Sequence, residues 1–167
     1  MTFEDYVAAR GPALVRLARL LTGDRHRAED LTQEVLGRAY VRWRSISRTD
    51  RPDIYIRRML VNANTSWWRR RSSRETPATA ELINTALDRS AVHRPGHDPG
   101  TAAAEHDAMW RLVSGLPERQ RAVLVLRYYE DLDDASIAEI LDCSAATVRT
   151  HAMRALAKLR TRHLVTH

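Results

Sequence analysis

The sequence predicts an all-α protein made of two small helical domains joined by a flexible linker. Apolar residues recur at spacings of three, four and seven along residues 1–71 and 101–167, as the buried face of a helix requires. Between these stretches, residues 72–100 are rich in proline, glycine and serine and poor in apolar side chains. The chain has only 6 glycines in 167 residues and contains neither a GxGxxG motif nor a Walker-type phosphate loop. These absences argue against a nucleotide-binding α/β enzyme.

Three amphipathic helices are expected in the N-terminal domain. In the first helix, Pro12 should kink the chain or start a second segment. Gly23 can take the left-handed conformation that ends this helix, and Asp24 can cap the second helix, whose buried face should run as far as Trp43. The third helix is expected to begin near Asp53. Together the three helices can bury one small hydrophobic core.

Four helices are expected in the C-terminal domain, and the last two form a helix-turn-helix. They should begin near residue 102, after Pro117, after Asp134 and after Ser144. In the turn, Asp142 must take a conformation that glycine usually supplies, and Ser144 can cap the last helix. The same pattern also fits an ordinary pair of helices with a basic surface.

The last helix presents candidate DNA-binding side chains on its outer face. No acidic residue occurs after residue 143, so the surface of this helix is basic. A basic helix fits the major groove, where arginine can bond bidentately to guanine and an apolar group can meet the thymine methyl. The candidates are Ser144, Thr147, Arg149, Thr150, Met153, Arg154 and Lys158.

The positive charge of the chain is concentrated in two separate blocks. The formal net charge is +6, but residues 51–75 and residues 144–167 each carry +5, whereas residues 116–143 carry −4. Two separated basic blocks predict that the protein contacts a polyanion twice. Each block taken alone is also compatible with a solvated helix face.

Several classes of protein are excluded by composition. The one cysteine, Cys143, excludes an internal disulfide, and the longest apolar run, four residues, is too short to span a membrane. The acidic N-terminus does not resemble a signal peptide, so we expect a cytoplasmic protein. The three histidines His93, His97 and His106 lack a paired acid or cysteine at the helical spacing that metal sites need. No metal, cofactor or catalytic residue is therefore expected.

Four segments of the chain resemble parts of known families. The helix-turn-helix alone, with Ser144–His151, resembles both LuxR-type regulators and region 4 of sigma factors. The preceding segment, Leu116–Leu132, resembles the start of region 4 in extracytoplasmic-function (ECF) sigma factors. His26–Val35 resembles the helix of sigma region 2 that docks on the β′ clamp of RNA polymerase, although an ordinary acidic solvated face would look similar. The resemblance implies contacts with core polymerase by Glu29, Asp30, Gln33 and Glu34.

Tyr55–Arg71 resembles the sigma segment that opens the promoter and holds the minus-ten element as a single strand. Opened DNA needs positive charges for its phosphates, flat rings for stacking and an amide that can read a flipped base. Asn62 stands at the position of the family's asparagine, whereas Trp67 and Trp68 replace a more usual Tyr-Leu pair. We expect Trp67 to pack in the hydrophobic core and Trp68 to be a surface ring. The implied DNA-binding residues are Arg57, Arg58, Asn62, Trp68, Arg69, Arg70 and Arg71.

Over residues 1–71 and 101–163 the chain resembles a minimal two-domain, actinobacterial ECF sigma factor. The resemblance implies a dissociable subunit, with no enzymatic activity, that binds core RNA polymerase at the β′ clamp and the β flap. It further implies contacts with the minus-ten and minus-thirty-five elements of promoter DNA and a part in opening the duplex. Family members are often restrained by an anti-sigma factor, which is a further candidate partner. The alternatives are a stand-alone LuxR-type regulator and an enzyme.

Overall fold

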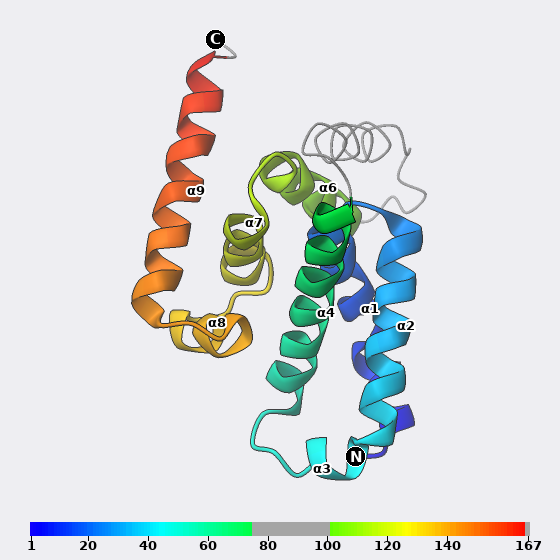
Figure 1. The fold of residues 1–167 in the computed structure, drawn as a ribbon. Helices are drawn as coiled ribbons and strands as arrows, with labels where there is room; N and C mark the ends of the chain where they lie inside the picture. Colours follow the sequence, from blue (N-terminus) through cyan, green and yellow to red (C-terminus); the bar gives the residue numbers. More distant parts are fainter. Residues whose placement is uncertain (75–100, 166–167) are drawn as a thin grey trace. The chain divides into compact units, whose positions relative to one another are not determined.

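The computed structural model describes residues 1–74 and 101–165, which belong to two compact units (Figure 1). Within these two ranges every regular element is a helix and no strand occurs, so the predicted all-α fold is confirmed. Most of the expected linker, with its histidines His93 and His97, lies outside the described residues. Each unit is built around its own hydrophobic core and is described separately below.

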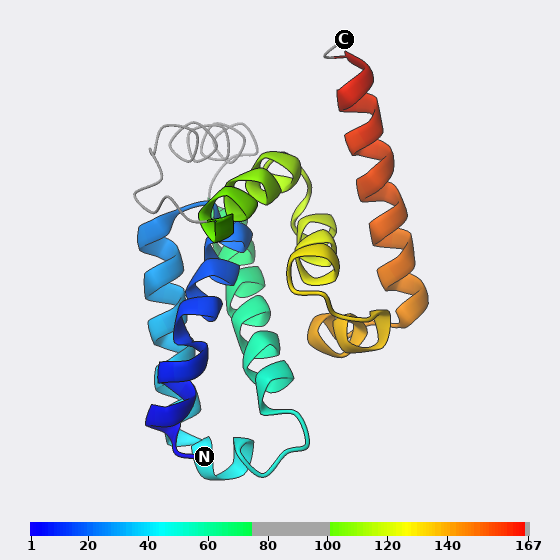
Figure 2. The ribbon, with the colours of Figure 1, turned by 180° about the vertical axis from the view of Figure 1, so that it is seen from behind.

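Unit 1 contains the helices α1 (Phe3–Thr22), α2 (Arg25–Val41), α3 (Trp43–Ile46) and α4 (Pro52–Arg74). The junction between α1 and α2 is the one that the sequence predicts. Gly23 has a φ of 73°, and its N–H donates to the carbonyl of Arg19 at 2.8 Å. The Asp24 side chain accepts from the N–H of His26 at 3.0 Å and so caps α2. Figure 2 shows α1 lying against α2 and α4.

Two details of unit 1 differ from the sequence-based expectation. Pro12 lies inside α1, which continues to Thr22, so no second helix starts there and a kink at Pro12 stays a prediction. The second helix ends at Val41, and Trp43 begins the short helix α3 instead of extending α2. Trp43 is still half-buried, because its ring lies 5.7 Å from that of Phe3 and 5.1 Å from that of Tyr6.

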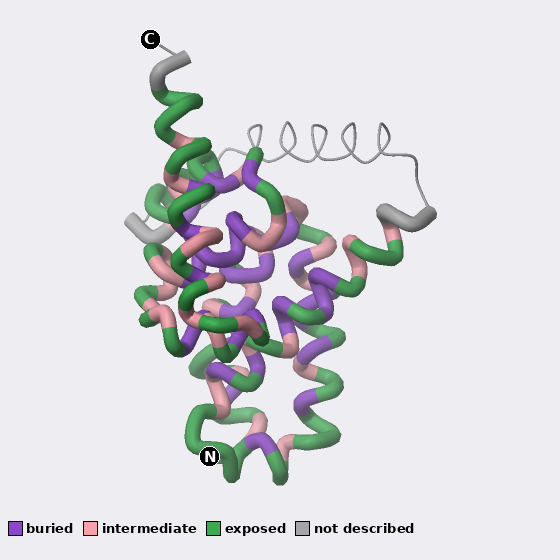
Figure 3. The backbone as a smooth tube through the Cα atoms, turned by 60° about the vertical axis from the view of Figure 1, so that its left-hand side comes forward, coloured by how far each residue is buried: buried purple, intermediate pink, exposed green. Residues whose placement is uncertain are grey.

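The hydrophobic core of unit 1 lies between α1, α2 and α4. Leu17 and Leu20 of α1, Val35 of α2, and Ile56 and Leu60 of α4 are almost completely buried. Figure 3 shows buried residues alternating with exposed ones along the helices, as expected when each helix buries one face. The opposite faces of α2 and α4 are therefore left for solvent or for partners.

Unit 2 contains α6 (Thr101–Val113), α7 (Glu118–Leu124), the π-helical turn η1 (Val125–Tyr129), α8 (Asp134–Leu141) and α9 (Ala145–Val165). The structure confirms the expected order of helices after residue 101. It adds η1, which continues directly from α7 and in which Glu130 N–H donates to the carbonyl of Val125 at 3.0 Å. Val123, Leu126, Ile137 and Val148 are fully buried and hold α7, η1, α8 and α9 together.

Candidate protein and nucleic-acid interfaces

The acidic face of α2 is exposed. Asp30, Gln33 and Glu34 are exposed and Glu29 is half-buried, whereas the intervening residues Ala28, Leu31, Thr32 and Val35 are buried. The spacing of three and four residues places Asp30, Gln33 and Glu34 on one side of the helix. We define Glu29, Asp30, Gln33 and Glu34 as the acidic face. It can receive a basic protein surface without any change in the fold of unit 1.

Two ion pairs lie along this acidic face. Glu29 pairs with Arg25 at 3.4 Å and Glu34 pairs with Arg38 at 2.7 Å, in both cases one helical turn away. The two arginine side chains are mostly exposed to solvent, and the two glutamate side chains are 46% exposed. Exposed pairs of this kind contribute only about 0.3–0.5 kcal/mol each, so a cation from a partner can replace the arginine at little cost.

One exposed stripe runs along α4. Tyr55, Arg58, Asn62, Ser66 and Arg69 are exposed and follow one another at spacings of three or four residues. We define these five residues as the basic stripe. It combines two guanidinium groups, an amide, a hydroxyl and a phenol ring, which are the groups that single-stranded nucleic acid requires.

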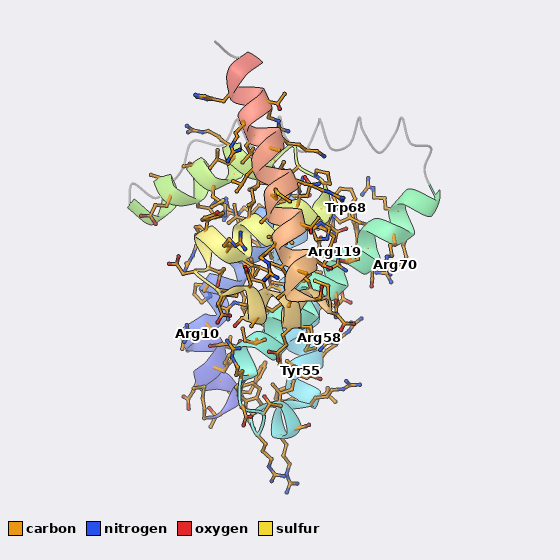
Figure 4. The ribbon with its side chains drawn as sticks, turned by 90° about the vertical axis from the view of Figure 1, so that its left-hand side faces the viewer. Arg10, Tyr55, Arg58, Trp68, Arg70 and Arg119 are labelled. Carbon is orange, nitrogen blue, oxygen red and sulfur yellow. The ribbon has the colours of Figure 1, made fainter. Side chains whose placement is uncertain are left out.

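Not all the predicted minus-ten residues belong to this stripe. Arg57 is half-buried on the side of α1, where its charge opposes the rise in the pKa of Tyr6 that burial and Asp53 cause. Arg71 lies with its guanidinium carbon 4.8 Å from the centroid of the Trp67 ring. Arg70 is exposed near the end of α4, two residues after Trp68 and therefore on another side of the helix (Figure 4). The structure thus brings together Arg58, Asn62 and Arg69, and places Arg57 and Arg71 on other sides of the helix.

Trp67 and Trp68 form a cluster with Arg27 of α2. The guanidinium carbon of Arg27 lies 3.0 Å from the centroid of the Trp67 ring and 5.3 Å from that of Trp68. Its Nη2 donates to Oδ1 of the buried Asn64 at 2.8 Å. Both tryptophans are half-buried, so Trp67 packs against charged groups at the edge of the unit and not in the centre of the core. The sequence analysis missed Arg27, because nothing local to its position indicates a contact 40 residues away.

A basic hollow at the other end of unit 1 was also missed. Its lining includes Arg42, Arg44 and Arg48 from the α2–α4 connection and Tyr55 from α4. The signal in the sequence was the repeated arginine of the segment RWRSISR. Tyr55 belongs both to this hollow and to the basic stripe, so the two features are continuous.

The helix-turn-helix of unit 2 forms through the local interactions that the sequence indicates. Asp133 caps α8 by accepting from the N–H of Ser136 at 2.8 Å. Asp142 then takes the left-handed conformation, with a φ of 54°, and reverses the chain. Ser144 Oγ accepts from the N–H of Thr147 at 3.1 Å and caps α9. From the other side of the turn, Nη1 of Arg119 in α7 donates to the carbonyl of Leu141 at 3.2 Å.

The outer face of α9 carries all the predicted major-groove residues. Ser144, Arg149, Met153, Arg154 and Lys158 are exposed. Thr147 and Thr150 are partly exposed, and the Thr150 hydroxyl donates to the carbonyl of Ala146 at 3.1 Å. Lys158 is nine positions after Arg149, which is two and a half helical turns, so these two cations lie at opposite edges of the face. Val148, Ala152 and Ala155 are buried on the inner side, as predicted.

His151 lies beside the predicted DNA-binding residues. Burial, together with the charges of Arg119 and Arg154, lowers the pKa of His151 below its ordinary value of 6.5. The imidazole therefore stays neutral under conditions in which a free histidine is partly charged.

Arg127 of η1 and Asp134 of α8 form an ion pair. This pair connects the start of the helix-turn-helix to the preceding turn.

Residues 1–74 and 101–165 contain neither a metal-binding cluster nor a membrane-spanning helix. In this part of the chain, no three side chains from histidine, cysteine, aspartate and glutamate lie together where they could hold a metal ion. His106 is buried, with its ring 5.9 Å from that of Tyr129. None of the described helices is long and apolar enough to cross a membrane.

Comparison with protein families identifies both units. The family model described as Sigma-70 region 2 matches residues 6–74, and the model described as Sigma-70, region 4 matches residues 106–159. The chain is 37% identical over 160 residues to the RNA polymerase sigma-E factor of Streptomyces coelicolor, covering 96% of this chain and 85% of the relative. The sigma-E factor of Streptomyces avermitilis is also 37% identical, with 84% of its length covered.

Two further proteins to which the chain is less identical in sequence are also sigma factors. The ECF RNA polymerase sigma factor SigW of Bacillus subtilis is 27% identical over 163 residues, covering 95% of this chain and 87% of SigW. In fold, the chain is similar to the sigma factor RpoE solved with the anti-sigma factor NepR from Bartonella quintana. The TM-score is 0.71 at 20% identity, with 99% of this chain and 98% of that chain covered. The LuxR-type alternative is therefore not favoured, and sigma factors are in general not enzymes. The chain belongs to the ECF sigma factors of the sigma-70 family, which direct RNA polymerase to initiate transcription.

Proposed function

We propose that the two units divide promoter recognition between them. Unit 1, corresponding to predicted domain 1–71, docks on core polymerase through the acidic face of α2 and holds the opened minus-ten element on α4. Unit 2, corresponding to predicted domain 101–167, reads the minus-thirty-five element with α9 and contacts the β flap. Residues 72–100 join the two as a linker. Family membership supports the general activity, and the arrangement of charged faces supports this assignment of residues.

The observation that carries the proposal is the separation of charge within unit 1. The helices α2 and α4 pack against each other through their buried faces, so the acidic face and the basic stripe are both directed away from the shared core. A polymerase surface bound to Asp30 and Glu34 therefore leaves Arg58, Asn62 and Arg69 accessible to DNA. Opposite charges suit the two partners, because one is a basic protein surface and the other is a polyanion.

On α4, we assign the basic stripe to the separated DNA strand. The Asn62 amide can donate to and accept from the edge of an extruded base, since it is exposed at the middle of the stripe. Arg58 and Arg69 can bind phosphates on either side of it. Trp68 and Arg70 extend the contact toward the end of the helix, with Arg57 and Arg71 as flanking charges.

On α9, we assign the outer face to the major groove. Arg149, with Thr150, Met153 and Arg154 beside it, is proposed to contact base edges. Lys158 lies at the opposite edge of the face and is proposed to contact phosphate only. The hydroxyl groups of Ser144 and Thr147, 2.9 Å apart at the start of the helix, are placed to contact the backbone.

We further propose that the protein acts in the cytoplasm and is held there by an anti-sigma factor. One solved structure of similar fold is the sigma factor RpoE with the anti-sigma factor NepR, and a second is CnrH with the cytosolic domain of CnrY. Core polymerase and such an inhibitor would compete for the same chain. Co-purification from the native cell, with and without added core polymerase, tests this competition.

The variant Asn62→Ala tests the assignment of α4. We expect the holoenzyme to form a closed promoter complex normally but to open the duplex more slowly, because an extruded base loses its amide partner. Permanganate footprinting of unpaired thymines measures opening, and filter binding measures the closed complex. Arg16→Ala, at an exposed position on α1, is the control. Tight and specific duplex binding by the protein alone, with normal opening by Asn62→Ala, would instead support a stand-alone regulator.

A further inference from the structure

We infer that Arg27 is a positioning residue that holds Trp68 ready to stack on an unpaired base. The inference rests on the proposed role of α4 and extends it to a residue of a different helix. It concerns how the protein fixes the ring in place before DNA arrives.

Arg27 of α2 contacts two residues of α4, Trp67 and Asn64. The guanidinium carbon lies 3.0 Å from the centroid of the indole, so the planar cation lies directly on the ring. At the same time Nη2 donates to Oδ1 of Asn64 at 2.8 Å, and Asn64 is only 1% exposed. One side chain of α2 is thus bonded at two points to α4, one turn of helix apart.

The ring of Trp67 in turn contacts the ring of Trp68. The two rings lie 5.0 Å apart between centroids and are perpendicular, an edge-to-face contact. The Arg27 guanidinium carbon is also 5.3 Å from the centroid of Trp68. Arg71 lies 4.8 Å from the centroid of Trp67, one turn further along α4. Trp68 is therefore restrained by its neighbour and by Arg27 together.

Trp67 and Trp68 lie near the C-terminal end of α4, next to exposed arginines. Trp68 is half-buried and is followed directly by the exposed Arg69, whereas the exposed Arg70 lies on another side of α4 (Figure 4). A base that stacks on Trp68 can have a phosphate bound by Arg69. A ring already held in one orientation loses less conformational entropy on stacking than a free ring, so binding of the strand is tighter.

The position of Arg27 on α2 adds a link to polymerase. Arg27 lies two residues before Glu29, where the acidic face of α2 begins. Its half-buried side chain extends to Asn64 and Trp67 of α4. Docking of α2 on polymerase would therefore fix the same helix that restrains the tryptophans. Lysine could keep the charge but not the flat stacking surface and the bond to Asn64 together, because it lacks a planar fork.

The decisive experiment is a double-mutant cycle on promoter opening by the complete holoenzyme, with 2-aminopurine in the minus-ten element as the probe. We expect Arg27→Gln to slow opening about three- to ten-fold, the range of one cation–π contact, without changing formation of the closed complex. We expect Trp68→Ala to slow opening as well. Because Arg27 acts through Trp68, adding Arg27→Gln to Trp68→Ala should have little further effect. Arg16→Gln on α1 removes the same charge and should leave opening unchanged.

Circular dichroism of the free protein gives a readout independent of transcription. The perpendicular indoles should give an exciton couplet, which is identified by its loss in Trp67→Phe. Arg27→Gln should weaken this couplet while helicity is kept, and Arg27→Lys should restore it only in part. If Arg27→Gln does not fold, Arg27→Lys is carried through the same cycle, and a weaker couplet with slower opening is the result expected.

Additive effects of Arg27→Gln and Trp68→Ala, or an unchanged couplet, would overturn the role of Arg27. That failure differs from failure of the proposed function. If Asn62→Ala and Arg69→Gln both leave opening unchanged, the basic stripe of α4 does not hold the strand, and the proposed function is itself wrong. If these two variants slow opening and Arg27→Gln does not, only the inference about Arg27 is wrong.

Discussion

Arg121 closes the end of α6 by donating a hydrogen bond from Nε to the carbonyl oxygen of Val113 at 3.2 Å. Its Nη2 donates to the carbonyls of Ser114 at 2.9 Å and Leu116 at 3.3 Å. The guanidinium lies 5.3 Å from the centroid of Trp110, and the side chain is only 8% exposed. A cation here satisfies the carbonyls that the end of a helix leaves without partners.

The variant Arg121→Met should therefore destabilise unit 2. Leaving buried carbonyls unsatisfied costs roughly 2–3 kcal/mol, which hydrogen exchange of the α6 and α7 amides can measure. The matched control is Arg111→Met on α6, the helix whose end Arg121 closes, where the side chain is exposed. That change should alter the free energy of unfolding by less than about 0.5 kcal/mol. Equal effects of the two variants would show that the bonds of Arg121 contribute nothing to stability.

Two glycines of unit 1 should respond in opposite ways to alanine. Gly37 lies in the middle of α2, and a Cβ there would meet no atom within 4 Å. Gly37→Ala should raise the free energy of unfolding by about 0.5–1 kcal/mol, because alanine loses less entropy in a helix. Gly23→Ala should lower it by about 1 kcal/mol, since the φ of 73° strains a side chain. Urea denaturation of both variants measures the difference, and the same sign for both would contradict this explanation.

Charge reversal on α2 should weaken binding to core polymerase. The double variant Asp30→Arg with Glu34→Arg replaces attraction by repulsion at the acidic face and should leave helicity intact, because both side chains are exposed. Fluorescence anisotropy of labelled protein with core polymerase measures the affinity at two salt concentrations. Asp50→Arg, at an exposed position outside α2, is the control for net charge. Unchanged affinity of the double variant would remove these residues from the docking surface.

The two cations at the edges of α9 should differ in their effect on promoter choice. Arg149→Ala should cost about 1–3 kcal/mol and relax the preference at one or two base pairs of the minus-thirty-five element. Lys158→Ala should weaken binding to all sequences alike and reduce the salt slope by about one unit. Binding of holoenzyme to a library of minus-thirty-five sequences separates the two outcomes. Full sequence preference in Arg149→Ala would mean that another side of α9 enters the groove.

The stability of unit 2 should depend on the protonation of His151. Its pKa is lowered in the folded state, so the unfolded chain takes up the proton first as the pH falls. The free energy of unfolding should be unaffected well above pH 6.5 and should decrease as the pH falls from 6.5 through the folded pKa. His151→Gln should remove this part of the decrease, which denaturation at several pH values can show. An identical pH profile for the variant would mean that burial and the charges of Arg119 and Arg154 do not lower the pKa of the imidazole.

The sequence by itself determined the helices and most of their ends. Gly23 and Asp24 end one helix and begin the next, and Asp142 and Ser144 do the same in the helix-turn-helix. These devices act between residues that are close in sequence, so the local pattern contains the whole signal. The exposed positions of Asp30 and Asn62 followed for the same reason, because helical spacing fixes which side of a helix faces outward.

Only the tertiary structure decided the contacts that position these groups. Arg27 meets Asn64 and Trp67 across 37 and 40 residues of chain, and a flexible arginine has no preferred partner until two helices have packed. In the sequence, Arg121 lies in the highly charged segment 116–143, which gives no sign that this arginine is buried. In the structure it is buried because the carbonyls at the end of α6 accept its hydrogen bonds. Helix ends are set by neighbouring residues, whereas the partner of a long charged side chain is set by which helix surfaces the folded core brings together.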